Sequence, residues 1–203
     1  MENNAKNMEE ITDIRKGKKS EPLTKVEMKL YRKFNGKLSW LAENCRPDLC
    51  FTALEMSRKN GRATLDDLKN INKTIKKVKG RSSRILLGKV GEPDDLIVYA
   101  IGDAAYKSDE KAVGGELVLL GNKKSDKAIA IYWKSKTVRQ VCHSAKDAET
   151  RNIVKLVDTS RFMTNQIEEM LFEKKKKIPI KIFSDSIPTL ESIASTSKLS
   201  RNC

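Results

Sequence analysis

A continuous apolar run in the middle of the chain limits its fold more than any other feature. Residues 96–101 (LIVYAI) form this run, which ends at Gly102-Asp103. A strand with one face in water alternates apolar and polar residues, whereas an unbroken run is typical of a strand buried on both faces. The run therefore predicts a central strand of a layered α/β domain.

The segments that follow this strand predict the rest of the domain. They are strands over 113–120 and 128–133, a long helix over 146–172, a strand over 178–183 that ends at Ser184-Asp185, and a helix over 187–195. The resulting order is β-β-β-α-β-α. A helix between the third and fourth strands requires a crossover, so the fourth strand is expected to lie parallel to one of the first three.

The N-terminal part of the chain has a different character. Residues 1–22 are polar and predict a disordered arm. Residues 23–84 predict a small helical segment, which begins with a capping box formed by Thr24 and Glu27. Its three helices are expected over 25–44, 48–59 and 65–79. The α/β domain then occupies residues 85–203.

The positive charge of the chain is concentrated in this N-terminal part. Of the 41 Lys and Arg and 27 Asp and Glu residues, 22 basic and 11 acidic ones lie in residues 1–90, a net charge of +11 there out of +14. The third predicted helix carries Lys69, Lys73, Lys76 and Lys77 away from its apolar side. These lysines are candidates for contacts with nucleic-acid phosphates, although a solvated helix face explains them equally simply.

Several classes of protein are excluded by what the sequence lacks. No apolar run approaches the roughly 18 residues of a membrane span, and the N-terminus has no apolar signal-peptide region. Four cysteines in 203 residues do not form a disulfide scaffold, and one histidine argues against His-rich zinc sites. We therefore expect an intracellular protein of the cytoplasm or nucleus, with no membrane association.

Three acidic residues stand out because of their positions. Asp103 and Asp185 each follow a strongly apolar strand, and Glu149 lies in the first turn of the long helix, on the stripe that faces the sheet. If the two strands are parallel neighbours, the three carboxylates converge at one sheet edge. Such carboxylates repel one another unless a hard divalent cation neutralises them. The pattern predicts a metal site suited to two-metal phosphodiester hydrolysis.

The same residues belong to a larger set of motifs. The set consists of Asp103-Ala104, the strand end Trp133-Lys134-Ser135-Lys136, the helix start from Ser144 to Ala148-Glu149, and Asp185. In this order the motifs resemble a known family, the ribonuclease H domain of copia-type LTR retrotransposon polyproteins. Upstream, Gly36-Lys37-Leu38, Trp40-Leu41 and Arg46-Pro47-Asp48 resemble the segment that ends the reverse transcriptase in such polyproteins. Cys45 stands where that segment has threonine.

The resemblance implies a fold, an activity and a site. The fold is a ribonuclease H-like mixed sheet with flanking helices, in which the first and fourth strands are adjacent. The activity is cleavage of the RNA strand of an RNA–DNA hybrid with two Mg²⁺ ions, for which Mn²⁺ can substitute. Asp103, Glu149 and Asp185 match the catalytic, metal-binding carboxylates, and Ser135 and Ser144 match motif serines that are structural or face the substrate.

The chain also departs from that family. It stops at Cys203, before the fifth strand, the last helix and a fourth acidic residue, so the resemblance implies a C-terminally truncated domain. The paired-Asp motif of the polymerase is absent. Two main functions therefore remain open: a ribonuclease with three of four acidic residues, and a catalytically impaired remnant that only binds nucleic acid. A less favoured third is an integrase-like or resolvase-like member of the same superfold, which would cleave DNA strands rather than RNA.

Overall fold

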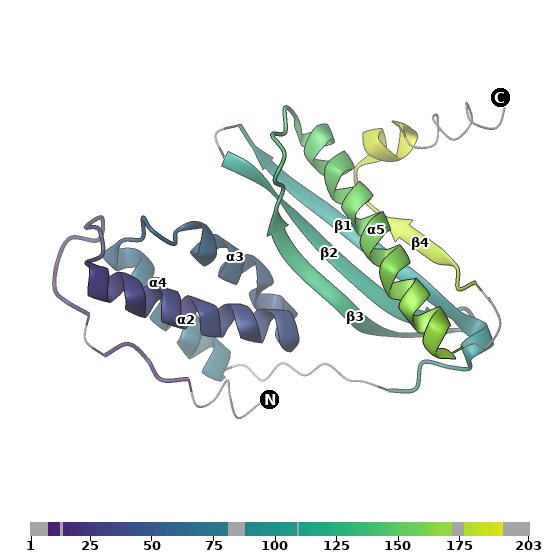
Figure 1. Cartoon of the computed structure of the whole chain (residues 1–203), viewed down its shortest axis with the longest axis horizontal. Coiled ribbons are helices and arrows are strands. Elements are labelled where there is room, and N and C mark those ends of the chain that lie inside the picture. Colours follow the sequence, from purple (N-terminus) through teal and green to yellow (C-terminus); the bar gives the residue numbers. More distant parts are fainter. Residues whose placement is uncertain (1–7, 13, 81–87, 109, 172–176, 193–203) are drawn as a thin grey trace. The chain divides into compact units, whose positions relative to one another are not determined.

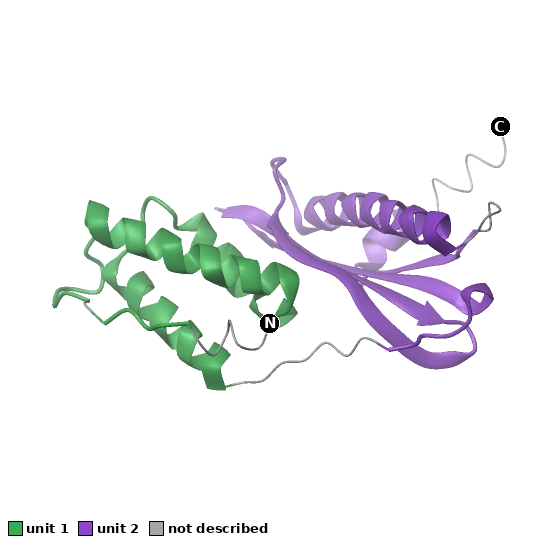
Figure 2. Cartoon of the chain, turned by 60° about the horizontal axis from the view of Figure 1, so that its bottom comes forward, with its two compact units in different colours: residues 1–85 green, residues 86–203 purple. Residues whose placement is uncertain are grey.

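A computed structural model describes residues 8–12, 14–80, 88–108, 110–171 and 177–192. The chain divides into two compact units, residues 1–85 and 86–203 (Figure 2). This division falls one residue from the predicted boundary. In the described residues, no helix combines the length and apolar character that a membrane span requires.

Unit 1 is helical. It consists of α2 (Lys25–Asn44), the 3₁₀ turn η1 (Pro47–Leu49), α3 (Cys50–Arg58) and α4 (Leu65–Gly80). The predicted capping box is confirmed, because Thr24 and Glu27 exchange both of its hydrogen bonds. The helix expected over 48–59 is divided in two, since Pro47 initiates a separate 3₁₀ turn before α3 begins.

The three helices of unit 1 enclose one apolar core. Its most deeply buried side chains are those of Tyr31, Leu38, Leu41, Leu68, Ile71 and Ile75. Together with Phe34, these residues recur at three- and four-residue intervals, which places them on one side of α2 and one side of α4. Tyr31 is fully buried, and its hydroxyl donates to the carbonyl of Met56 at 2.9 Å, so the polar end of the ring is satisfied.

The described part of the N-terminal arm differs from the expected disorder. Met8 and Ile11 are buried in the core of unit 1, and Ile11 exchanges two backbone hydrogen bonds with the side chain of Asn72. Polar composition alone predicts disorder, but two apolar side chains and a matched amide partner on α4 anchor this segment. Residues 1–7 lie outside the described residues.

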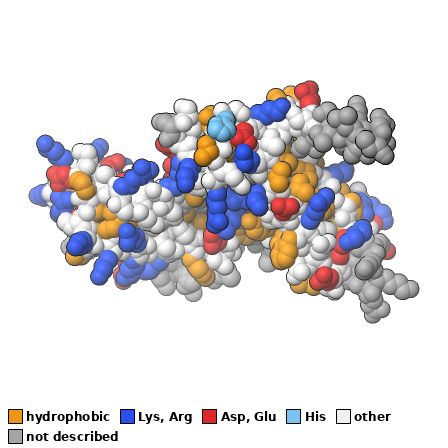
Figure 3. Space-filling view, turned by 45° about the horizontal axis from the view of Figure 1, so that its top comes forward, with side chains coloured by type: hydrophobic (Ala, Val, Ile, Leu, Met, Phe, Trp, Pro, Cys, Tyr) orange, Lys and Arg blue, Asp and Glu red, His pale blue; other side chains and the backbone are white. Residues whose placement is uncertain are grey.

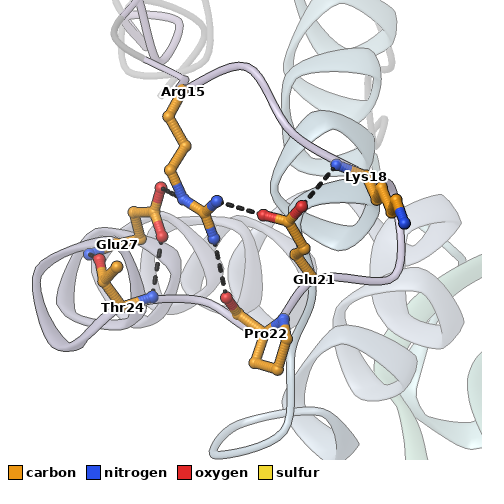
Figure 4. A network of polar contacts seen from close by, with 6 residues as sticks. All are labelled: Arg15, Lys18, Glu21, Pro22, Thr24 and Glu27. Atoms are coloured by element: carbon orange, nitrogen blue, oxygen red, sulfur yellow. Dashed lines mark hydrogen bonds and ion pairs between the residues drawn. The ribbon is translucent and has the colours of Figure 1, made fainter.

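Arg15 fixes the rest of the arm to the start of α2. Its guanidinium forms ion pairs with Glu21 and Glu27 and donates to the carbonyl of Pro22 at 3.0 Å (Figure 4). Glu27 also accepts from the backbone N–H of Thr24, so the arm and the capping box form one polar network.

Unit 2 is a mixed α/β unit with a four-stranded sheet. Its elements are η2 (Pro93–Asp95), β1 (Leu96–Lys107), β2 (Glu110–Asn122), β3 (Ser125–Thr137), α5 (Ala145–Leu171) and β4 (Ile180–Phe183). The strand order is β3-β2-β1-β4, with β1 and β4 parallel and the other pairs antiparallel. The predicted element order and the adjacency of the first and fourth strands are confirmed. Residues 187–192 are helical, and 193–195 lie outside the described residues.

The helix α5 covers one face of this sheet (Figure 1). Val98, Ala100, Val118 and Leu156 are completely buried between them. The other face is more open, because Ile101 and its β4 partner Phe183 are 40% and 48% exposed. Burial of the first strand on both faces therefore holds for its beginning but not at Ile101.

Asp103 occupies a different place from the one expected. It was predicted at the end of its strand, but β1 continues to Lys107 because its antiparallel pairing with β2 extends that far. The parallel pairing with β4 stops at Ile101 and Phe183. Asp103 therefore lies inside a strand, two residues beyond the point where β4 leaves it.

Candidate metal centre

Three carboxylates converge in unit 2. Asp103 comes from β1, Glu149 from the first part of α5 and Asp185 from the segment after β4. One oxygen of each lies within 4.8 Å of the others. Asp103 and Asp185 are exposed, whereas Glu149 is only 8% exposed. The predicted convergence of these three residues is confirmed.

The register of the parallel pair brings the two aspartates together. Ile101 on β1 lies opposite Phe183 on β4. Asp103 and Asp185 each follow two residues after this pair, so they lie side by side. The start of α5 is fixed by Ser144, whose hydroxyl accepts from the backbone N–H of Asp147 at 3.1 Å as a helix cap. Glu149 then follows one turn into the helix, next to the fully buried Ala148.

Glu149 is held by the strand that carries Asp103. Its Oε1 accepts a hydrogen bond of 2.9 Å from the backbone N–H of Ala104. Its Oε2 is buried and has no hydrogen-bond partner among the described residues. Burial raises the pKa of Glu149, and the charges of Asp103 and Asp185 raise it further, against the opposing effect of the Ala104 hydrogen bond.

These features fit a bound divalent cation. Carboxylate oxygens are the ligands that Mg²⁺ and Mn²⁺ prefer, and a buried oxygen without a hydrogen-bond donor is available to a metal. A cation would also remove the mutual repulsion of three acidic groups within 4.8 Å. The three residues could therefore hold a metal ion.

One residue at this site is absent from the sequence-based prediction. Asn152 lies on α5, three residues after Glu149, and is 1% exposed. Its Nδ2 donates to the carbonyl oxygens of Asp103 and Gly115, at 2.9 and 3.0 Å. The sequence did contain a signal for it, because Asn152 lies on the side of the helix that faces the sheet.

The two motif serines have different surroundings. Ser144 is exposed and caps α5, which is a structural role. Ser135 on β3 is half-buried and pairs with Gly115, which in turn pairs with Asp103. Directly paired residues share a face of the sheet, so Asp103, Gly115 and Ser135 form a row across three strands, about 10 Å long.

The four candidate lysines lie on α4 in unit 1. Lys73, Lys76 and Lys77 are exposed, and Lys69 is half-buried. Lys76 already forms an ion pair with Glu10 at 3.5 Å. Figure 3 shows Lys and Arg side chains over the visible face of unit 1, with fewer Asp and Glu between them.

A second group of basic residues in unit 1 was not predicted. Lys25, Lys29 and Arg32 follow one another along α2 and line an open groove of about 400 Å³, together with Leu23, Met28 and Gly61. In the described part of the chain, none of these three cations has an acidic partner, whereas Arg15, Lys59 and Lys76 do. Their spacing of four and three residues was the signal in the sequence.

No protein-family model, curated protein or solved structure matches this chain. What is established is a mixed α/β unit with one parallel strand pair, a helical unit beside it in the sequence, and an acidic cluster that could bind a metal ion. The function of the chain is therefore inferred from its own residues.

Proposed function

We propose that the chain is a retroelement-derived ribonuclease H-like protein that cleaves the RNA strand of RNA–DNA hybrids. The observation that carries the proposal is the convergence of Asp103, Glu149 and Asp185 within 4.8 Å, with an unpartnered buried oxygen on Glu149. The motif order described above supports an origin in a copia-type retrotransposon polyprotein, with unit 1 as the end of its reverse transcriptase.

The three carboxylates would hold two Mg²⁺ ions, or Mn²⁺ in their place. Such ions activate a water for attack on the phosphodiester and stabilise the leaving oxygen. Asp103 and Asp185 are exposed and therefore accessible from solvent and to a substrate, whereas Glu149 is anchored by Ala104 and fixes the buried side of the site. Their different exposure suits one rigid and two substrate-facing ligands.

The sheet offers a surface for the hybrid beside these carboxylates. In the row from Asp103 through Gly115 to Ser135, the central residue has no side chain to obstruct an approaching strand. The Ser135 hydroxyl can bond a phosphate or a ribose hydroxyl, and the 2′-hydroxyl is the group that distinguishes RNA from DNA. The basic residues of unit 1 supply attraction to phosphates without reading sequence.

A cleavage assay on the full chain tests the proposal. A hybrid labelled on its RNA strand is incubated with the protein and Mg²⁺, alongside Asp103→Asn and a control, Asp126→Asn, which changes an exposed aspartate on β3 outside the cluster. Cleavage by the wild type and the control, lost in Asp103→Asn, is the expected result.

The other outcomes separate the alternatives. Salt-sensitive binding of the hybrid without cleavage by any variant would replace the proposal with the nucleic-acid-binding remnant. Cleavage of duplex DNA in place of RNA would assign the site to a different nuclease. If the protein neither binds nor cleaves the hybrid, both functions are rejected.

A further inference from the structure

A buried amide connects the helix of the carboxylate site to two strands of the sheet. The Nδ2 atom of Asn152 carries two hydrogens, and it uses them on the carbonyl oxygens of Asp103 and Gly115. These two residues are directly opposite each other in the β1–β2 ladder. One side chain on α5 therefore binds both strands at the position of a candidate metal ligand.

Two glycines, on β1 and β2, leave space for the side chain of Asn152. A Cβ atom on Gly114 would lie 2.1 Å from Oδ1 of Asn152, and one on Gly102 would lie 3.2 Å from its Nδ2 and 2.9 Å from Leu156. Any larger residue at position 114 would displace the amide. The glycine on β2 and the asparagine on α5 thus depend on each other.

The oxygen of this buried amide is unsatisfied. Oδ1 of Asn152 is buried without a hydrogen-bond partner among the described residues. A leucine of similar size would avoid this unpaired oxygen and would pack against the apolar neighbour Leu156. A buried polar atom without a partner calls for an explanation, and here the explanation lies in the two bonds made by Nδ2.

We infer that Asn152 is a positioning residue that sets the placement of Glu149 relative to Asp103. Glu149 lies one turn before Asn152 on the same helix, so the bonds of Asn152 fix the height and rotation of α5 at the turn that carries Glu149. The bond from Ala104 to Glu149 then forms at the adjacent residue of β1. Asn152 is not one of the three clustered carboxylates, so its role is to position them through the groups that it bonds.

This inference rests on the proposed metal site, and it also predicts an effect that needs no metal. Groups that orient metal ligands typically contribute 10- to 100-fold to metal affinity. Loss of Asn152 is therefore expected to weaken Mn²⁺ binding by about 10-fold or more. In the metal-free protein it is expected to expose the Ala104 amide, which should exchange its hydrogen at least about 10-fold faster.

Two variants and one control provide the test. Asn152→Leu removes both donors at similar size, and the double variant Asn152→Ala/Gly114→Ala removes them while refilling the space. Thr164→Val is the control. Thr164 is also buried on α5, but among the described residues its hydroxyl bonds only to the carbonyl of Ser160, three turns from the site. Mn²⁺ dissociation constants and Ala104 amide exchange are measured for each full-length protein.

The outcomes are distinguishable. Weaker Mn²⁺ binding and faster Ala104 exchange in the Asn152 variants, with both unchanged in Thr164→Val, support the positioning role. Unchanged values in a folded Asn152 variant overturn it and leave the metal site intact. If the wild type binds no Mn²⁺, the proposed function fails, and the Ala104 exchange rate alone decides the role of Asn152.

Discussion

The backbone N–H of Ala104 donates to Oε1 of Glu149 across a separation of 45 residues. This bond connects the central strand to the second turn of α5, and the second oxygen of Glu149 is buried without a donor among the described residues. The carboxyl group is thus held in place while its negative charge is poorly stabilised by the protein itself. Burial and the neighbouring aspartates raise its pKa for this reason.

Replacing Glu149 with glutamine should stabilise the metal-free protein in a pH-dependent way. Because the pKa of Glu149 is higher in the folded chain than in the unfolded one, the folded chain binds more protons between those two values, and stability falls as the pH rises through them. The glutamine of Glu149→Gln does not titrate, so this variant does not lose stability in this way. Its amide oxygen still accepts from the backbone N–H of Ala104. Its melting temperature in EDTA should exceed that of the wild type at pH 7, with the difference shrinking toward pH 4.

Glu169→Gln is the control for this comparison, because Glu169 is exposed on the same helix. Its melting temperature should follow that of the wild type at every pH. A destabilised Glu149→Gln protein at pH 7 would show that the negative charge of Glu149 is compensated by the fold.

Divalent cations should raise the stability of unit 2. A ligand that binds only the folded state adds about 2.7 kcal/mol at 100 times its dissociation constant. The melting temperature should therefore rise with Mg²⁺ or Mn²⁺ in the wild type and in Asp126→Asn. The increase should be lost in Asp103→Asn and Asp185→Asn. An equal increase in all four proteins would locate the cation elsewhere.

The convergence of the three carboxylates was predictable from the sequence because the two aspartates follow strongly apolar segments. It did not predict that β1 continues past Asp103, since Ala104 and Ala105 carry little strand preference and only pairing with β2 keeps them extended. Asn152 was missed because a polar residue among helical positions resembles a surface residue until the glycine opposite it is known.

The order of the N-terminal arm was not predicted, for a related reason. Met8 and Ile11 are two apolar residues within a polar segment, and nothing in the sequence identifies Asn72 as the partner of Ile11. Long-range contacts of this kind depend on the tertiary structure, whereas capping boxes and apolar periodicity are local. The three helices of unit 1 were predicted from such local signals.

Ile11→Ala should destabilise unit 1 by about 2 kcal/mol, the lower end of the cost of truncating a buried isoleucine. Ile11 is 6% exposed in the core. Val26→Ala, at a side chain that is 77% exposed on α2, should cause no comparable loss. Urea denaturation of both variants checks this. If the two variants unfold with equal free energies, the arm does not pack in the core and is disordered, as its composition suggests.

Lys136→Met should destabilise unit 2 by about 3 kcal/mol, because it removes an ion-pair partner of the buried Glu116 carboxylate. The Glu116 side chain is 0% exposed, pairs with Lys136 and accepts from the hydroxyl of Tyr132 at 3.4 Å. Exposed Lys127 on β3 provides the control, Lys127→Met. The double variant Glu116→Met/Lys136→Met should recover most of the loss, as denaturant titrations would show.

Removing the three cations of the α2 groove should weaken hybrid binding and lessen its dependence on salt. Lys25, Lys29 and Arg32 span about 10 Å of helix, and each phosphate contact contributes about 0.7 to 0.9 to the slope of log affinity against log salt concentration. The triple glutamine variant should therefore show a slope shallower by about 2 to 3, measured by fluorescence anisotropy in EDTA. A second triple variant at Lys59, Lys89 and Lys124 changes the net charge equally at lysines paired with acids. If both triple variants lower the slope alike, net charge rather than the groove determines binding.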